Sequence, residues 1–135
     1  TMIDCLFCGV QTNSPEYARE PDKGIVMENK LAYALRDGFP VTPMHTLIIS
    51  KRHIRDYFEL RNDELISCSE LIHSLKNEML RLDETITGFN IGINNGESSG
   101  QTIFHCHIHL IPRRDGDVPN PRGGVRHIIP GKGDY

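Results

Sequence analysis

The segment HCHIHLI (residues 105–111) places three histidines at alternate positions, separated by cysteine or isoleucine. Successive side chains of a β-strand point to opposite faces, so on a strand His105, His107 and His109 would share one face. An imidazole can ligate a metal, attack an electrophile or transfer a proton. A lone histidine on a polar strand face is usually solvated or structural, and chance is the competing explanation. Three at this spacing favour a chemical site.

Three histidines on one straight strand cannot all bind the same metal ion. The rise is about 3.3 Å per residue, so the Cα atoms of His105 and His109 would lie about 13 Å apart. Zinc–nitrogen bonds are only about 2 Å long, so two neighbouring histidines could chelate one ion but all three could not. We therefore expect the three histidines to have different roles.

The segment NNGESSGQT (residues 94–102) precedes the histidines and suits a phosphate ligand. Gly96 and Gly100 allow the backbone to approach a ligand closely. Neutral donors are offered by Ser98, Ser99, Gln101 and Thr102. Such a turn can hold phosphate oxygens with backbone N–H groups, although most Gly/Ser loops only connect elements. Beside it, a neutral histidine Nε2 could attack phosphorus while its Nδ1–H is oriented by an acceptor.

The composition indicates one globular domain, residues 1–135, with 38% hydrophobic and 24% charged residues. A net charge of -3 argues against non-specific nucleic-acid binding, which needs a basic face. We see no membrane span and no signal peptide, and we take Thr1 as a remnant before the start at Met2. We expect a cytoplasmic protein with reduced cysteines, and residues 113–135 form a Pro/Gly-rich tail.

The elements that must position these groups predict an α+β fold. Apolar residues at steps of three and four predict a long helix over residues 62–86, capped by Asn62. We expect five strands, at residues 24–28, 31–37, 45–50, 89–95 and 102–111. Helix and strands do not alternate strictly, which favours a mostly antiparallel sheet.

The long helix and the histidine strand each carry an apolar face, and we expect these faces to pack together. The helix face consists of Leu65, Cys68, Ile72, Leu75, Met79 and Leu82. The strand face, opposite the histidines, consists of Phe104, Cys106, Ile108 and Leu110. The histidine face would then be free for chemistry.

These motifs resemble the signature of the histidine triad (HIT) family, in which three histidines alternate with apolar residues. Three stretches carry the likeness: GINNGESSGQTIFHCHIHLIPR (92–113), LRDGFPVTPMHTLIISKRHI (35–54) and CLFC (5–8). The resemblance covers most of the chain and is weakest after about residue 113. It implies a HIT-like fold, with a five-stranded antiparallel sheet, one long and one short helix, and a homodimer.

The resemblance also implies catalytic roles. His107 matches the nucleophile that takes up a nucleoside monophosphate, and His109 matches the histidine that contacts phosphate and assists the leaving group. His45 matches a histidine behind the catalytic centre. Asp37 is implied to bind ribose hydroxyls, and the positions matching phosphate neighbours are Asn94, Gln101 and Thr102.

Two positions depart from the family pattern, and five other residues each have two possible roles. Met44 stands where a small residue is usual, and Gly38 follows Asp37 where an apolar residue is common; both could reshape the nucleotide pocket. Phe7 and Leu35 are either walls of an adenine pocket or core residues. Three tail residues either contact a second nucleotide or are solvated: Arg122, Arg126 and His127.

A zinc site is implied by the same resemblance. The family ligands correspond to Cys5, Cys8, His53 and His105, with residues 1–10 as the zinc-bearing N-terminus. Two thiolates and two imidazoles suit a closed tetrahedral structural site, which would separate a ligating His105 from an attacking His107. The alternatives are a redox pair or a fortuitous Cys-x-x-Cys, and DCLFCGV lacks the strand–helix context of a redox motif.

The implied activity is hydrolysis of a nucleoside phosphoanhydride or phosphoramidate. We expect a dinucleoside polyphosphate such as Ap4A as the preferred substrate, with AMP released through a covalent nucleotidyl-histidine. A nucleotidyltransferase of the same chemistry, a non-catalytic purine-nucleotide-binding module and a simple zinc module are the alternatives. The expected partners are a small purine nucleotide and a second copy of the chain, with no nucleic acid and no membrane.

Overall fold

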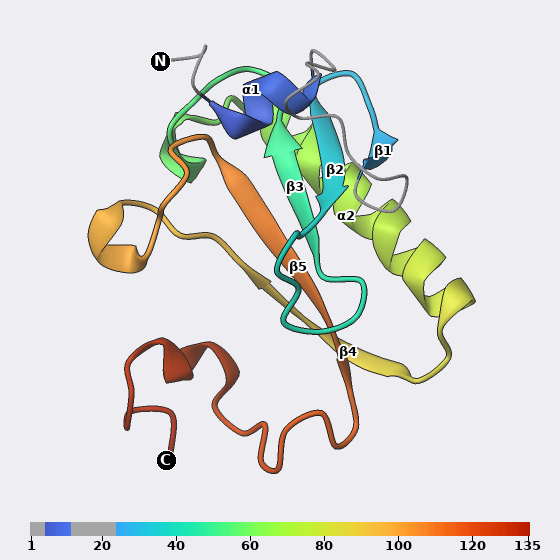
Figure 1. Cartoon of the computed structure of the whole chain (residues 1–135), viewed down its shortest axis with the longest axis vertical. Helices are drawn as coiled ribbons and strands as arrows, with labels where there is room; N and C mark the ends of the chain where they lie inside the picture. Colours follow the sequence, from blue (N-terminus) through green and yellow to red (C-terminus); the bar gives the residue numbers. More distant parts are fainter. Residues whose placement is uncertain (1–4, 12–23) are drawn as a thin grey trace.

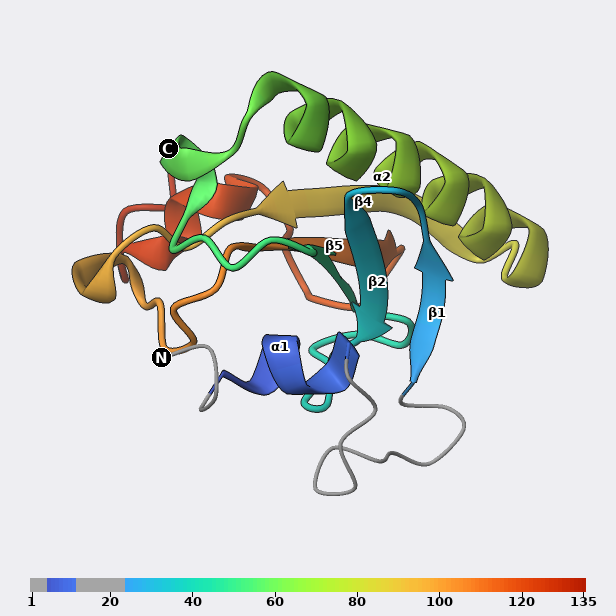
Figure 2. The same ribbon diagram turned by 90° about the horizontal axis from the view of Figure 1, so that it is seen from above.

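The computed structural model describes residues 5–11 and 24–135 and shows a five-stranded antiparallel sheet between two helices (Figures 1 and 2). The helices are α1 (Leu6–Gln11) and α2 (Asn62–Leu82). The strands are β1 (Ile25–Glu28), β2 (Ala32–Arg36), β3 (Thr46–Ser50), β4 (Ile86–Gly92) and β5 (His107–Arg114). Their order in the sheet is β1-β2-β3-β5-β4. The predicted α+β architecture, with one long and one short helix, is confirmed.

The long helix α2 covers one face of the sheet. Its buried side chains join alternate residues of the central strands in one cluster: Ala32, Ala34, Ile48, Cys68, Leu71, Leu75, Met79, Ile86, Ile108 and Leu110. Ile108 and Leu110 thus pack toward the helix as predicted. Phe104 does not, because it lies before β5 and is 41% exposed, with the Arg55 guanidinium over its ring.

The short helix α1 lies against the opposite face (Figure 2). Phe7 and Val10 pack with residues of β2 and β3 that point away from α2: Tyr33, Leu35, Leu47 and Ile49. The Tyr33 hydroxyl donates to the Phe7 carbonyl at 2.7 Å, and the Gln11 amide donates to the Lys51 carbonyl at 3.0 Å. Phe7 and Leu35 are therefore core residues, each 1% exposed.

The boundaries of the helix and of two strands differ from the expected ones. α2 ends at Leu82 and not at residue 86, because Asp83 leaves the helical conformation and its carboxylate accepts from the Thr85 N–H. β4 therefore begins at Ile86 and ends at Gly92, where residues 89–95 were expected. Arg61, not Asn62, is the N-cap, and the Arg61 N–H donates to Glu64.

The buried stripe of α2 is rotated relative to the predicted one. Leu65 and Leu82 are exposed, whereas Ser67 and Leu71 are buried between the other core positions. The periodicity identified the helix correctly, but two apolar side chains lie on its solvent side. Among the described residues, no helix combines the length and apolar character that crossing a membrane requires.

Candidate active site and metal centre

Two of the three histidines lie on β5, and the third precedes it. The strand begins at His107 and not at residue 102, because the Cys106 N–H pairs with the Ile54 carbonyl at 2.8 Å, outside the sheet ladder. His107 pairs with Ile49, and His109 pairs with Leu47 on one side and Gly92 on the other. His105 is thus displaced from the line of the strand. This bend separates the first histidine from the other two.

The predicted zinc ligands converge on one point. The Sγ atoms of Cys5 and Cys8 and the ring nitrogens of His53 and His105 all lie within 4.8 Å of one another. Cys5 Sγ lies 3.4 Å from His105 Nδ1, and Cys8 Sγ lies 3.2 Å from His53 Nδ1 and 3.6 Å from His105 Nδ1. A tetrahedral ion with Zn–S of about 2.3 Å and Zn–N of about 2.0 Å would separate S from N by roughly 3.5 Å. These separations therefore fit a tetrahedral Cys2His2 zinc site.

The surroundings of His105 leave its Nδ1 available to a metal. Its Nε2–H donates to the Ser50 carbonyl at 2.6 Å, which fixes the tautomer with a lone pair on Nδ1. Burial lowers the pKa of His105 to about 4, so the ring is neutral at pH 7. Burial raises the pKa of the Cys8 thiol to about 11, so a metal must displace its proton on binding.

His107 lies outside that group and has the opposite tautomer. Its Nδ1–H donates to the His105 carbonyl at 2.8 Å, so the lone pair is on Nε2. The Phe7 ring lies edge-on at 5.1 Å between centroids, and the His109 ring lies at 5.4 Å. Burial lowers the pKa of His107, which keeps the ring neutral near pH 7. The geometry gives a neutral, oriented imidazole with a free nucleophilic nitrogen.

His45 and His109 form a hydrogen-bonded pair beside His107. The Val41 N–H donates to His45 Nδ1 at 3.1 Å, so His45 carries its proton on Nε2. That Nε2–H donates to His109 Nδ1 at 2.9 Å, so the neutral His109 ring carries its own proton on Nε2. Burial, with the neighbouring His107 and His45, lowers the pKa of His109 to about 4. His109 is therefore a hydrogen-bond donor at neutral pH.

Asp37 borders this pair. Its Oδ2 lies 3.5 Å from His45 Nε2, and its Oδ1 accepts from the Phe39 N–H at 2.8 Å. Burial lowers the pKa of His45, and the Asp37 carboxylate acts against that shift. Asp37, His45 and His109 also lie close enough to hold a cation. The Val41 N–H, however, keeps the proton on His45 Nε2, so that nitrogen has no lone pair to offer a metal.

The three loop positions have different surroundings. The Gln101 side chain is 3% exposed, and its amide is fully engaged within the loops: it accepts from the Gly96 N–H and donates to the Arg55 and Ile103 carbonyls. Gln101 therefore fixes the shape of the loop. Thr102 is exposed, and Asn94 is half-buried.

Gly96 and Gly100 determine the backbone course of this loop. Gly96 and Gly100 have φ values of 92° and 93°, and a Cβ at either position would meet nothing within 4 Å. Space alone would thus tolerate a side chain, but these φ values strongly favour glycine. The turn depends on their conformational freedom.

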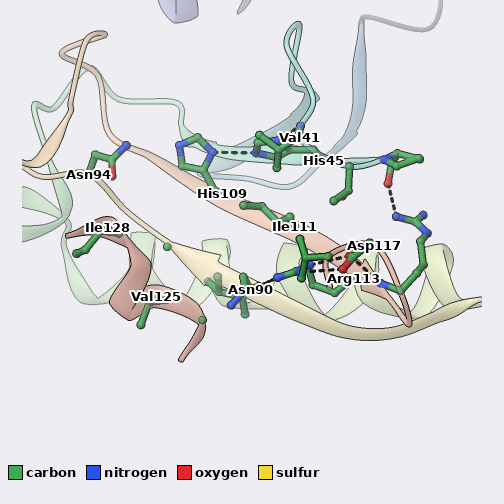
Figure 3. A pocket seen from close by; sticks show the side chains of 17 residues that line it. Val41, His45, Asn90, Asn94, His109, Ile111, Arg113, Asp117, Val125 and Ile128 are labelled. Carbon is green, nitrogen blue, oxygen red and sulfur yellow. Dashed lines mark hydrogen bonds and ion pairs between the residues drawn. The ribbon is translucent and has the colours of Figure 1, made fainter. Parts of the chain in front are cut away.

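A pocket of about 610 Å³ opens beside His109 (Figure 3). His45, His109 and Asn94 line the end nearest the triad. The remaining wall comes from β4, β5, residues 41–43 and the C-terminal segment: Val41, Thr42, Pro43, Asn90, Ile91, Gly92, Ile111, Arg113, Arg114, Asp117, Val118, Gly124, Val125 and Ile128. His107 does not line it. The pocket therefore lies beyond His109 as seen from His107.

The comparison with known families agrees with this geometry. A model of the HIT domain matches residues 18–116, which is most of the chain. The protein belongs to the HIT family. An uncharacterized 16.1 kDa HIT-like protein of Mycoplasma pneumoniae is 33% identical over 112 residues, covering 82% of this chain and 72% of that protein.

Solved HIT structures share the fold. A zinc-bound histidine triad family protein from Mycobacterium smegmatis has a TM-score of 0.73 and 28% identity, over 87% of this chain and 80% of that chain. The diadenosine triphosphate hydrolase of Plasmodium falciparum, in complex with Cyclomarin A, has a TM-score of 0.67 and 29% identity, over 76% and 68% of the two chains. This HIT domain thus has the fold of a family that includes hydrolases and a zinc-bound member.

The sequence did not indicate which residues of the C-terminal segment line the pocket of this HIT domain. Gly124 to Ile128 form a short 3-10 helix that runs back beside β4 (Figure 1). The sequence left open whether three tail residues contact a second nucleotide or are solvated. The pocket is lined by none of them: Arg122, Arg126 and His127. The two arginines stack on the Tyr135 ring, and His127 donates to the Arg122 carbonyl.

Proposed function

We propose that this HIT domain hydrolyses nucleoside phosphoanhydrides, preferentially dinucleoside polyphosphates such as Ap4A, through a nucleotidyl group carried on His107. The observation that supports this proposal most directly is the tautomer of His107. Its Nδ1–H is held by the His105 carbonyl, which leaves the Nε2 lone pair free beside His109. The similarity to a diadenosine triphosphate hydrolase supports the substrate class.

In the first step, the Nε2 lone pair of His107 forms a bond to the α-phosphorus. The bond from phosphorus to the bridging oxygen breaks, and its electron pair leaves with the polyphosphate. The Nε2–H of His109 donates a hydrogen bond to the oxygen on which charge develops, which stabilises the transition state. A polyphosphate leaves as an anion, so this step needs no full proton transfer. The phosphoramidate alternative does need one, because an amine leaves only when protonated.

In the second step, water attacks the phosphorus of the nucleotidyl-histidine. The phosphorus–nitrogen bond breaks, its electron pair returns to His107 Nε2, AMP is released and one proton passes to solvent. His45 acts through His109, because its Nε2–H fixes the His109 tautomer. The roles proposed for the other residues are ribose binding by Asp37 and phosphate contacts by Asn94 and Thr102. We propose that Gln101 supports the phosphate turn from within.

The zinc ion is proposed to be structural. Cys5, Cys8, His53 and His105 would fill all four positions of a tetrahedral ion, which would fix α1 and the loop of His53 to the start of β5. The carbonyl of His105 orients His107, so the metal site would steady the nucleophile through the backbone. The zinc-bound relative supports this assignment.

We further propose a cytoplasmic homodimer. β4 is an edge strand of the sheet and exposes Ile91, which suits contact with a second copy of the chain. Light scattering after size exclusion measures the mass, and a monomer at micromolar concentration would contradict the dimer.

The test is hydrolysis by a His107→Asn variant. Loss of the nucleophile should lower kcat about 10³-fold or more, because the covalent intermediate cannot form. His73→Asn is the matched control, since His73 is exposed on α2, which packs on the sheet face opposite the histidines. α-Labelled substrate should give an acid-labile adduct on the wild-type chain and none on His107→Asn. Wild-type rates in His107→Asn would overturn the proposal.

A further inference from the structure

The chain between β3 and α2, residues 51–61, carries the proposed zinc ligand His53 (Figure 2). All of these residues are described, and the only regular element among them is the 3-10 helix Tyr57–Glu59. His53 therefore belongs to no helix or strand that could hold its backbone in place. Other contacts must fix the position of this ligand, and the side chain of the preceding residue makes several.

That preceding residue, Arg52, binds the first turn of α2 at two points. Its Nε donates to Glu64 Oε2 at 3.0 Å, and its Nη2 donates to Glu64 Oε1 at 2.7 Å. The same Nη2 donates to the Glu59 carbonyl at 3.0 Å. A planar guanidinium that contacts a carboxylate at two points fixes the orientation of the pair as well as its distance. Arg52 is thereby joined both to α2 and to the 3-10 helix before it.

Glu64 is a buried charge that depends on this partner. Its side chain is only 4% exposed, and its Oε1 also accepts from the Arg61 N–H at 2.9 Å. Hydrogen bonds from Arg52 lower the pKa of Glu64, so the carboxylate is ionised at neutral pH. Within the described part of the chain, Arg52 is the one cationic side chain that forms an ion pair with it. Because a buried carboxylate without a cation is costly, the pair stays formed in the folded protein.

The backbone of Arg52 is connected to both imidazoles of the candidate zinc site. The Ser50 hydroxyl donates to the Arg52 carbonyl at 2.9 Å, which closes a turn at the end of β3. The Ser50 carbonyl in turn accepts the Nε2–H of His105 at 2.6 Å. His53 follows Arg52 directly in the sequence. The residue that is tied to α2 thus lies between the acceptor of one imidazole and the other imidazole itself.

We propose that the Arg52–Glu64 ion pair positions the two imidazole ligands of the zinc site. It fixes the backbone of residues 50–53, on which both ligands depend: His53 through its own Cα, and His105 through the Ser50 carbonyl. Neither Arg52 nor Glu64 belongs to the four-ligand group, so both act as positioning residues. This role rests on the zinc site proposed above and deepens that assignment.

The first measurement is the zinc dissociation constant of the whole chain, obtained by titrating the zinc-loaded protein with a chromophoric chelator. In Arg52→Lys the charge beside Glu64 remains, but a single ammonium cannot reproduce the two-point contact. The dissociation constant should rise about tenfold or more, which is the usual effect of losing a hydrogen-bonded group behind a metal ligand.

Glu64→Gln breaks the same pair from the other side. It leaves no buried carboxylate without a partner, and the Arg52 side chain is 38% exposed and can be solvated, so this variant should fold. Its zinc dissociation constant should also rise. The double variant should rise no further than the larger of the two single variants, because the same interaction is lost only once. Additive rises would contradict a shared role.

The matched control is a similar ion pair at the other end of α2. Arg114 donates to Asp83, the C-cap of α2, at 2.9 Å and to the Pro43 carbonyl at 3.0 Å. Arg114 therefore joins a carboxylate to a backbone carbonyl, as Arg52 does, but on the last strand of the chain and after the histidines. Arg114→Lys should lower the melting temperature of the protein and leave the zinc dissociation constant at its wild-type value.

A spectroscopic readout separates positioning from stability. Cobalt(II) in place of zinc gives visible absorption bands whose intensity depends on tetrahedral coordination. Arg52→Lys should weaken or shift these bands, because displaced imidazoles distort the tetrahedron. Arg114→Lys should reproduce the wild-type spectrum, since a merely structural loss does not alter the geometry of the bound ion.

The outcomes separate the positioning role from the zinc site itself. A dissociation constant that rises in Arg52→Lys and not in Arg114→Lys, with altered cobalt bands, supports the proposal. Equal constants in the wild type and Arg52→Lys, or equal rises in the two lysine variants, overturn it while bound zinc still supports the metal assignment. If the wild-type chain binds no zinc, the zinc site fails and the positioning role falls with it.

Discussion

The two ends of the triad face of β5 differ in how they are covered. At the His105 end, α1 closes over the sheet, Phe7 is 1% exposed, and four ligand atoms converge within 4.8 Å. At the His109 end, the sheet opens into a pocket of about 610 Å³ bounded by the C-terminal segment. The strand therefore joins a rigid, closed site to an open one, with His107 at the boundary.

The difference shows that the hydrogen-bond partner of one ring nitrogen decides what the other ring nitrogen can offer. The Ser50 carbonyl takes the Nε2–H of His105 and leaves Nδ1 for a metal. The His105 carbonyl accepts the Nδ1–H of His107 and leaves the lone pair on Nε2. His45 donates to Nδ1 of His109 and makes its Nε2 a donor. Each role can be removed separately.

The largest effect is expected when a zinc ligand at the His105 end is removed. Cys8→Ser removes a thiolate from the four-ligand set, so bound zinc should fall from one ion per chain to nearly none. Loss of a tightly bound ion that stabilises only the native state should lower Tm by about 10 °C or more. Metal analysis and thermal unfolding measure the two effects.

The control for this variant is Cys68→Ser. Cys68 is buried in the α2 core, so its substitution should lower stability while zinc content stays at one per chain. Hydrogen exchange should show lost protection in Cys8→Ser at α1 and residues 51–54, with β4 unchanged. Equal zinc content in the two variants would contradict the metal assignment.

From the sequence we predicted the helices and strands and expected different roles for the three histidines. We did not predict the hydrogen bonds that distinguish these histidines from one another. Periodicity located α2 and the strands, and the length of a straight strand ruled out a three-histidine metal site. The strand was nevertheless placed too early, because the pairing of Cys106 with Ile54 joins residues 52 positions apart and leaves no local signature. The engagement of Gln101 with Arg55 was hidden for the same reason.

The pocket was the least predictable part of the site. Its wall includes Val125 and Ile128 from a segment whose Pro/Gly content indicated only a surface tail. The segment lies beside β4 through contacts that depend on the complete fold. The candidate zinc ligands at the closed end, by contrast, could be named from the sequence, because cysteines and histidines stand at positions that resemble those of the HIT family. Metal sites are easier to infer from sequence because few residue types can form them.

A smaller effect is expected from breaking the pair behind the triad. His45→Leu removes the donor that fixes the His109 tautomer. The proton of the neutral His109 ring is then no longer confined to Nε2. We expect kcat to fall about 10²-fold, with KM changed less than threefold, because the lost interaction acts mainly in the transition state.

His45→Gln is the conservative variant that isolates this effect. Its amide N–H can still donate toward His109 Nδ1, so at least tenfold of the lost kcat should return. A merely structural role for His45 would lower the stability of both variants and would not separate their kcat values. Equal kcat in the Leu and Gln variants would contradict the positioning role.

The smallest effect concerns the acidity of His109 and compares two leaving groups. An amine leaving from a nucleoside phosphoramidate must gain a proton, whereas a polyphosphate need not. With a pKa of about 4, His109 is protonated on both nitrogens in only about one molecule in 10³ at pH 7, and this fraction rises about tenfold for each unit that the pH falls. The ratio of the phosphoramidate rate to the phosphoanhydride rate should therefore rise up to about tenfold from pH 7.5 to pH 6.5. Protonation of His107 affects both substrates and cancels in the ratio, so a ratio that stays flat over this range would show that the proton does not come from His109.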